Sequence, residues 1–486
     1  MNDPSPQDDT TLRNLRRLIW LYFWLLLFEG ALRKWVLPQL SNPLLLIRDP
    51  VVIAIYMLSL RARVFPRNAW VLSLGIIGVL SLLLSVLVMV LNFGLPPKSI
   101  AIITGFGFRS NFLHLPLIFV MAKVVRMEDV KRFGWWTLVM SVPMSLLLVA
   151  QFQAGPESWL NRTAGGEGEM LGSALGKVRT AGTFSYVLGV VAFYSLATSF
   201  LVWAALRGEI YKTWVLIGAG AAIVIGIAMS GSRSVVGAVA VVVASLVVVF
   251  FVRPSAINRF GQTLIIALIL GLIVTRLPIF KEGFNVLTTR FSEVAEATEK
   301  SVGAGLVERV FSGFTESAYI WSKAPFLGYG LGIGTNAGAK FLTGRNMFLL
   351  SEGEWSRIFL ESGPLFGLAY VFWRVALVVR VGLFCVASVK LGNVLPLLIF
   401  SSSFMPLLNG QLGQPTVLGF VAFATGLALA ARNGDNATPG VTPDGGAGSK
   451  AAPVRRIARR SEFASRLHRP PPAPARQDHA NGAVDR

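Results

Sequence analysis

The stretch SEGEWSRIFLESGPLFG, residues 351–367, places an arginine and several carboxylates where a long apolar segment begins. Glu354, Arg357 and Glu361 stand at i, i+3 and i+7, a spacing that puts their side chains on one face of a helix. A carboxylate can act as a general base toward a hydroxyl group, and a guanidinium can bind phosphate oxygens. This face could therefore do chemistry on a substrate. Alternatively, its charges form an internal salt-bridge ladder that holds the preceding loop on the neighbouring helices.

The composition places these residues in a polytopic membrane protein. Of 486 residues, 53% are hydrophobic and only 14% are charged, and the mean hydropathy is +0.61. Apolar runs of about twenty residues, long enough to cross a bilayer as helices, recur along the chain. The net charge of +20 does not indicate nucleic-acid binding, because the basic residues lie in the loops between these runs and in the tail. The single cysteine, Cys385, excludes a disulfide framework.

We predict an all-α protein with about twelve transmembrane helices and with both termini in the cytoplasm. The orientation follows from the Lys and Arg residues, which recur in loops on the same side as the basic N-terminus. Residues 1–17 form a cytoplasmic N-terminus, residues 18–432 the polytopic membrane domain, and residues 433–486 a disordered basic tail. The predicted spans are residues 18–36, 43–60, 69–92, 99–122, 133–152, 184–206, 212–230, 234–252, 262–280, 362–386, 391–409 and 415–431.

This topology leaves two substantial external loops, about residues 153–183 and 281–356. Recurrent apolar spacings predict a helix over about residues 289–321 in the larger loop. The glycine run GYGLGIGTNAG, residues 328–338, follows no clear strand and does not indicate a nucleotide-binding loop. We expect it to be a flexible loop.

Charged residues inside predicted spans are functional candidates, because each costs roughly 2.5–3.5 kcal/mol to insert in a membrane. Alternatively, opposite charges pair inside the helix bundle. Arg48 and Asp49 are adjacent and point in different directions on a helix, so we expect each to have its own partner. The full set is Glu29, Arg33, Lys34, Arg48, Asp49, Arg109 and Arg374.

The turn MSGSRSVVGA carries Arg233 between two spans that have almost no other charge. A guanidinium at the external membrane surface is well suited to binding a phosphate group, although it could instead extend to lipid headgroups. The only aspartate between residues 51 and 431 is Asp129, in a loop predicted to be cytoplasmic. Because the external loops lack an Asp-x-Asp pair and a His–carboxylate cluster, we expect no metal or other cofactor.

Together, the helix number, the SGSRS turn and the late external loop resemble the O-antigen ligase and O-antigen (Wzy-type) polymerase superfamily. The resemblance covers about residues 180–430. The loop ends in the segments PFLGYGLGIG and EGEWSRIFLESGPLFG. Residues that match the family's motifs are the turn arginine Arg233, Pro325, Gly328 and Gly330 of P-x-x-G-x-G, and Glu361 and Gly363 of Glu-x-Gly.

The chain departs from the ligases of this family at one motif. Glu352 stands where the ligases have a histidine, and Gly353 replaces the asparagine that follows it. The departure weakens a ligase interpretation and favours the exopolysaccharide polymerase-like branch.

The resemblance implies a glycosyltransferase that polymerises undecaprenyl-diphosphate-linked oligosaccharide repeat units into surface polysaccharide. The reaction would take place without a metal, at the periplasmic face of the bacterial inner membrane, with inversion at the anomeric carbon. A chain-length regulator and a flippase of the same pathway are the expected partners. The alternatives are an O-antigen ligase, which differs in its acceptor, and a transporter or flippase for polysaccharide lipids.

Within that mechanism, Glu354 is the predicted base and Glu352 the alternative. Because no metal is expected, arginines must stabilise the charge of the leaving diphosphate. The residues predicted to bind the diphosphate or the glycan are Arg233, Arg309 and Arg357, then Arg179, Arg345 and Glu361.

Overall fold

The computed structural model shows a chain built from helices and loops, and the part of it that is described contains no β-strand. The prediction of an all-α protein is confirmed. The predicted span 262–280 and the predicted tail from residue 435 onward lie outside the described residues. The structure describes residues 6–164, 176–254, 281–286, 288–289, 302–344 and 347–434.

Among these residues, seven helical segments are long and apolar enough to cross a membrane. A further apolar helix, α9 (Thr213–Met229), is shorter. The count of twelve spans and their orientation stay predictions. The seven segments are Pro38–Arg61, α4 (Ala69–Phe93), α7 (Met127–Gln153), α8 (Val187–Arg207), α10 (Arg233–Val252), α15 (Glu354–Lys390) and Pro415–Arg432 of α18 (Pro415–Gly434).

Several predicted spans are interrupted where polar residues enter the bundle. Irregular backbone is tolerated at membrane depth when it is buried in protein, because side chains and other backbone groups satisfy it there. The predicted spans in question are 18–36, 43–60, 99–122 and 391–409. They correspond to α1 (Pro6–Ala31) with η1 (Leu32–Val36), α2 (Ser41–Leu44) with α3 (Arg48–Arg61), α5 (Pro97–Phe108) with η3 (Arg109–Leu113) and α6 (Leu117–Val124), and α16 (Leu395–Ser401) with α17 (Phe404–Asn409).

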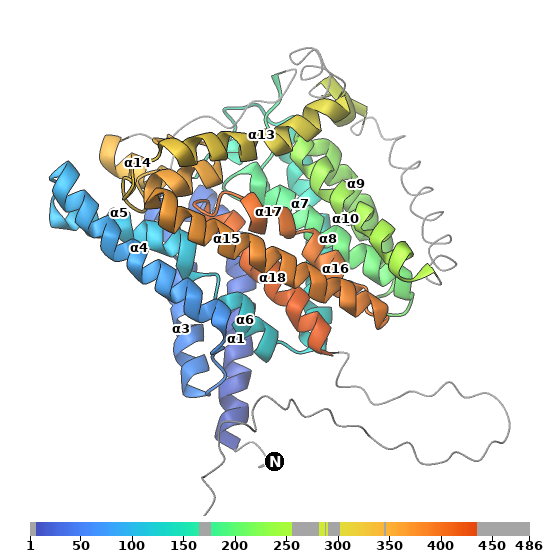
Figure 1. Cartoon of the computed structure of the whole chain (residues 1–486). Helices are drawn as coiled ribbons and strands as arrows, with labels where there is room; N and C mark the ends of the chain where they lie inside the picture. Colours follow the sequence, from blue (N-terminus) through green and yellow to red (C-terminus); the bar gives the residue numbers. More distant parts are fainter. Residues whose placement is uncertain are drawn as a thin grey trace, which may run out of the picture. The chain divides into compact units, whose positions relative to one another are not determined.

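The helices pack around a core that runs through most of the bundle. Helix α7 packs on α8 and α9, and α18 packs on α6, α8 and α16. Helix α13 (Val302–Lys323), which contains part of the predicted loop helix, lies along α15 (Figure 1). The segment 290–301 of that predicted helix is outside the described residues.

Helix α15 bends sharply at Gly363, which has φ 73° and ψ 171° and precedes Pro364. A positive φ is accessible to glycine because it has no Cβ. The bend turns the first part of the helix, which carries the charged residues, away from the long apolar part. The glycine run, residues 328–338, packs at this bend, where Tyr329 N and Gly330 N donate to the carbonyl oxygens of Leu360 and Glu361 at 2.7 and 2.9 Å.

The glycine run packs closely on its neighbours, and its flexibility stays a prediction. At Gly332 φ is 90°, and a Cβ there would lie 2.1 Å from the carbonyl oxygen of Ile103. The loop therefore needs glycine for close packing against α5 and α15. It leads into α14 (Asn336–Thr343), a helix that the sequence analysis did not predict.

Candidate functional site

The predicted charged face of α15 exists, but it is buried. Arg357 Nη1 donates to Glu361 Oε2 at 2.7 Å, and Arg357 Nε donates to Glu354 Oε2 at 3.1 Å. Arg357 Nη2 also donates to Asn111 Oδ1 at 3.0 Å. We call Asn111, Glu354, Arg357, Glu361 and Arg374 the Arg357 cluster.

Glu354 is held on both carboxylate oxygens. Oε1 accepts hydrogen bonds from Arg374 Nη1 at 2.9 Å and from the backbone N of Leu412 at 3.2 Å. Oε2 accepts from both Nε and Nη2 of Arg357 at 3.1 Å. Four hydrogen bonds match the four acceptor positions of a carboxylate, and the side chain is only 1% exposed. The geometry therefore gives Glu354 the contacts of a structural anchor, as the salt-bridge ladder interpretation expects.

Glu361 extends the ladder into the glycine loop. Its Oε1 accepts from the backbone N of Gly334 at 2.9 Å, and its side chain is fully buried. The ladder therefore fixes the loop just before α14 to the start of α15.

Two further members of the cluster are Arg374, later in α15, and Asn111, from a distant part of the chain. Arg374 Nε donates to the carbonyl oxygen of Leu407 at 2.8 Å, and its Nη2 donates to those of Pro406 and Gly410 at 3.2 and 3.1 Å. Arg374 was predicted to be a charged residue inside a span but was not assigned to this site. No sequence signal indicated Asn111, which is buried in the short π-helix η3.

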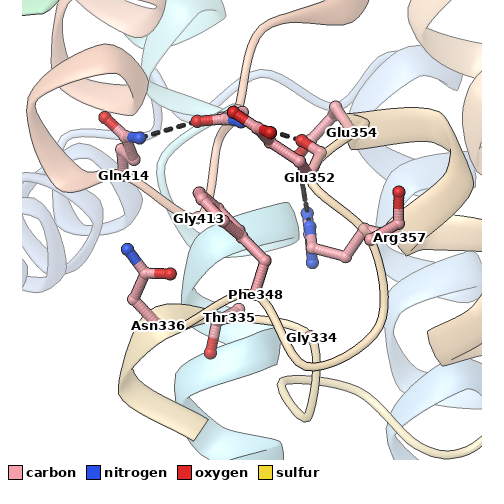
Figure 2. A pocket seen from close by; sticks show the side chains of 11 residues that line it. Gly334, Thr335, Asn336, Phe348, Glu352, Glu354, Arg357, Gly413 and Gln414 are labelled. Carbon is pink, nitrogen blue, oxygen red and sulfur yellow. Dashed lines mark hydrogen bonds and ion pairs between the residues drawn. The ribbon is translucent and has the colours of Figure 1, made fainter. Parts of the chain in front are cut away.

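A small pocket opens beside this cluster, with a cavity volume of about 20 Å³ and an open mouth. Glu354 and Arg357 form part of its wall. Figure 2 shows that the remaining side chains come from separate segments and face the same space. They include Asn336, Phe348, Glu352, Gln411 and Gln414.

Glu352 is the exposed carboxylate of this pocket. Its backbone oxygen accepts from Gln411 Nε2 at 2.8 Å, and Gln411 Oε1 accepts from Gln414 Nε2 at 2.6 Å. This chain of amides positions Glu352 through its backbone. Within the described part of the chain, no hydrogen bond or ion pair engages the Glu352 carboxylate, so the geometry favours Glu352 over Glu354 as a base toward a bound hydroxyl.

Arg233 and Arg179 are not among the described residues that line this pocket. Arg233 is the first residue of α10 and is half-buried, as is Arg179 in the loop before α8. The hydroxyl of Thr180 donates to the carbonyl oxygen of Met229 at 2.9 Å, so the two arginine-bearing segments are in contact. Arg345 and the side chain of Arg309 lie outside the described residues.

A second buried group of charges lies among the N-terminal helices. Arg48 Nε donates to Glu29 Oε2 at 2.7 Å, whereas Asp49 pairs with Arg109 and lies 2.9 Å from Nε2 of His114. The prediction that Arg48 and Asp49 have separate partners is therefore confirmed. We call these five residues the Arg48 cluster.

Two segments connect the Arg48 and Arg357 clusters. The π-helix η3 carries Arg109 of the first and Asn111 of the second. The segment before α18 supplies the backbone N that binds Glu354, and at Pro415 it supplies a carbonyl oxygen that accepts from Arg48 Nη2 at 2.6 Å. The same segment contributes Gln411 and Gln414 to the pocket.

The part of the chain that the structure describes holds no group of three or more His, Cys, Asp and Glu side chains that could bind a metal ion. No protein-family model matches the chain, and no curated protein matches it either. The resemblance noted from the sequence therefore depends on the helix number, the loop layout and the motifs, and the function is argued from the geometry of the pocket.

Proposed function

We propose that this protein is a membrane glycosyltransferase that joins undecaprenyl-diphosphate-linked repeat units into a polysaccharide. It would act at the periplasmic face of the bacterial inner membrane, with about twelve spans and both termini in the cytoplasm. In that topology the pocket lies at the outer end of the membrane domain, where lipid-linked glycans are exposed. A flippase would supply the substrate, and a chain-length regulator would act with the polymerase.

One observation carries the proposal. The pocket contains a carboxylate, Glu352, that is exposed and held in place through its backbone, next to the buried Arg357 cluster. General-base catalysis requires such a group within reach of the hydroxyl that it deprotonates. The buried ion pairs of the cluster fix the surrounding backbone, and rigid support is what precise positioning of a reacting group needs.

The reaction is a single displacement. Glu352 takes the proton of an acceptor sugar hydroxyl, and the oxygen forms a bond to the anomeric carbon of the donor. The bond from that carbon to the diphosphate breaks, and the electron pair leaves with the lipid diphosphate. One displacement inverts the anomeric configuration, as the resemblance implies.

The arginines have different roles in this proposal. Arg357 uses four of its five N–H groups on Glu354, Glu361 and Asn111, so its main role is to hold the cluster. Arg233 and Arg179 are carried by two segments in contact with each other. We assign these two to the diphosphate of the donor, because a pair of guanidinium groups is suited to its charge.

The test uses purified protein in detergent with the undecaprenyl-diphosphate-linked repeat unit of its own host, without metal or nucleotide. Products are separated by size on a gel. The proposal predicts a ladder at multiples of one repeat unit, and Glu352→Gln should abolish it. A product that forms only after a second lipid acceptor is added would indicate the ligase, and movement of intact substrate between leaflets without any new glycosidic bond would indicate the transporter.

A further inference from the structure

We infer that the pocket is the acceptor subsite and that it binds a neutral terminal sugar through Asn336 and Phe348. The inference rests on the proposed function and adds the class of group that the pocket recognises. The sequence motifs indicated neither residue as part of the site. Three features of the pocket carry the inference: an unpaired acceptor atom, an apolar surface and the charge of its lining.

Asn336 Oδ1 is the unpaired acceptor. This oxygen is buried in a residue that lines the pocket, and it has no hydrogen-bond partner among the described residues. A buried polar atom left unpaired costs about 1–3 kcal/mol, so a ligand group that donates a hydrogen bond there gains affinity. A sugar hydroxyl is such a donor.

Asn336 is also held in place by its neighbours. It is the first residue of α14, and Thr335 caps that helix by accepting a hydrogen bond from the backbone N of Gly338 at 3.0 Å. The hydroxyl of Thr335 donates in turn to the carbonyl oxygen of Gly332 at 2.6 Å. A side chain on a fixed backbone binds its ligand with a smaller loss of conformational entropy.

Phe348 supplies the apolar surface. Its side chain is 40% exposed and lines the pocket. One face of a sugar ring carries mainly C–H groups, and covering both apolar surfaces removes them from water. In Figure 2, Phe348 lies in the space between Asn336 and Arg357.

The charge of the lining favours a neutral sugar. Among the described lining residues, Glu354 and Arg357 are paired in the buried cluster, which leaves the exposed Glu352 as the charge that a ligand meets. The amide groups of Gln411 and Gln414 and the hydroxyl of Ser351 complete the polar lining. A sugar carboxylate would be repelled by Glu352, whereas hydroxyl groups can donate to it.

The subsite is tested by binding a glycan that cannot act as donor. The probe is a free oligosaccharide obtained from the host polysaccharide by partial hydrolysis, without lipid or diphosphate. Saturation-transfer NMR on the full-length protein in detergent identifies the protons that contact the protein, and a titration gives the Kd. We expect the strongest signals from the non-reducing terminal sugar.

Matched variants assign the binding to the named residues. Asn336→Ala and Phe348→Ala should each weaken binding about tenfold, since each removes one contact worth about 1.4 kcal/mol. Asn336→Asp keeps an acceptor oxygen at the same place and should stay within about threefold of the wild-type protein. Glu352→Gln should lose polymerisation, as the proposed function predicts. Thermal unfolding of every variant verifies that it is folded.

The outcomes separate this inference from the proposed function. Saccharide binding that depends on Asn336 but no polymer from the lipid-linked substrate would keep the subsite and overturn the polymerase. Polymer formation with wild-type affinity in both Asn336→Ala and Phe348→Ala would keep the polymerase and overturn the subsite. Strongest signals from an acidic sugar would also overturn the inference.

Discussion

The two buried charge clusters differ in how completely their polar atoms are paired. The Arg357 cluster forms a wall of the pocket, and both oxygens of its central carboxylate are occupied. The Arg48 cluster contains buried Nη1 atoms of Arg48 and Arg109 that have no hydrogen-bond partner among the described residues. The polar atoms of the Arg357 cluster are paired, whereas the Arg48 cluster keeps unpaired guanidinium nitrogens.

This difference shows that a charge within a membrane span does not identify a catalytic residue by itself. The helix-face residues Glu354, Arg357 and Glu361 pair with one another and bind Leu412, Asn111 and Gly334 of other segments. The residue that the geometry favours for catalysis is Glu352, which stands outside the ladder and has an exposed side chain. The buried clusters therefore serve the site by fixing the backbone around it.

The largest effect on stability is expected for Arg374→Met. The substitution leaves Glu354 without one of its two guanidinium partners. It also removes a donor from three backbone carbonyl groups, of which that of Pro406 still accepts from the backbone N of Gly410. Removing one partner of a buried ion pair costs about 3–5 kcal/mol, so the free energy of unfolding in detergent should fall by that amount.

The control is Arg380→Met, the same chemical change on an exposed residue of the same helix. It should change the free energy of unfolding by less than about 1 kcal/mol. Equal losses in the two variants would show that the Arg357 cluster does not stabilise the bundle.

A slightly smaller loss, about 3 kcal/mol, is expected for Arg48→Met, because Glu29 keeps Arg33 nearby at 3.7 Å. Combining it with Glu29→Gln removes the unpaired carboxylate and should restore at least half of the lost stability. Denaturant titration of the single and double variants measures this coupling. Additive losses would contradict the pairing, and loss of polymerisation in a stable double variant would give the Arg48 cluster a catalytic role.

A smaller effect, about 1–2 kcal/mol, is expected for Asn111→Ala. The side chain of Asn111 accepts one hydrogen bond from Arg357, and its loss leaves one guanidinium N–H group unpaired. Because η3 also carries Arg109, the comparison of Asn111→Ala with the double variant Asn111→Ala/Arg48→Met tests whether the two clusters are coupled. A loss in the double variant equal to the sum of the single losses would show that they are independent.

The smallest effect on stability, below about 1 kcal/mol, is expected for Gln411→Ala, which should nevertheless slow polymerisation about three- to tenfold. The amide of Gln411 holds the backbone of Glu352 and is exposed, so its removal loosens the base without leaving a buried group unpaired. Rates at saturating substrate and thermal unfolding are measured together. An unchanged rate would show that this amide does not position Glu352.

Much of the helical architecture could be predicted from the sequence. Long apolar runs without charges, such as α4 and α8, were located to within a few residues because hydrophobicity alone specifies them. The i, i+3, i+7 spacing on α15 correctly predicted a shared face, and the adjacent Arg48 and Asp49 have different partners as expected. These features depend on local geometry, which a sequence records directly.

Features that depend on contacts between distant segments could not be predicted. The spacing on α15 did not reveal whether its face was exposed, because the burial of Glu354 depends on Arg374, Leu412 and Asn111. The sharp bend of α15 had a signal that was not used: Gly363 and Pro364 form a dipeptide typical of a turn. The run of glycines has the composition of a flexible loop, and its close packing on α5 shows only in three dimensions.

The most direct test of the account compares Glu352→Gln with Glu354→Gln in the polymerisation assay, with thermal unfolding measured on the same samples. The account predicts that Glu352→Gln unfolds like the wild-type protein and polymerises at least about a hundredfold more slowly. Glu354→Gln should lower the unfolding temperature, because Arg357 and Arg374 lose the charge of their partner. Wild-type polymerisation by Glu352→Gln, with the loss found instead in a Glu354→Gln variant of unchanged stability, would contradict the account and make Glu354 the base.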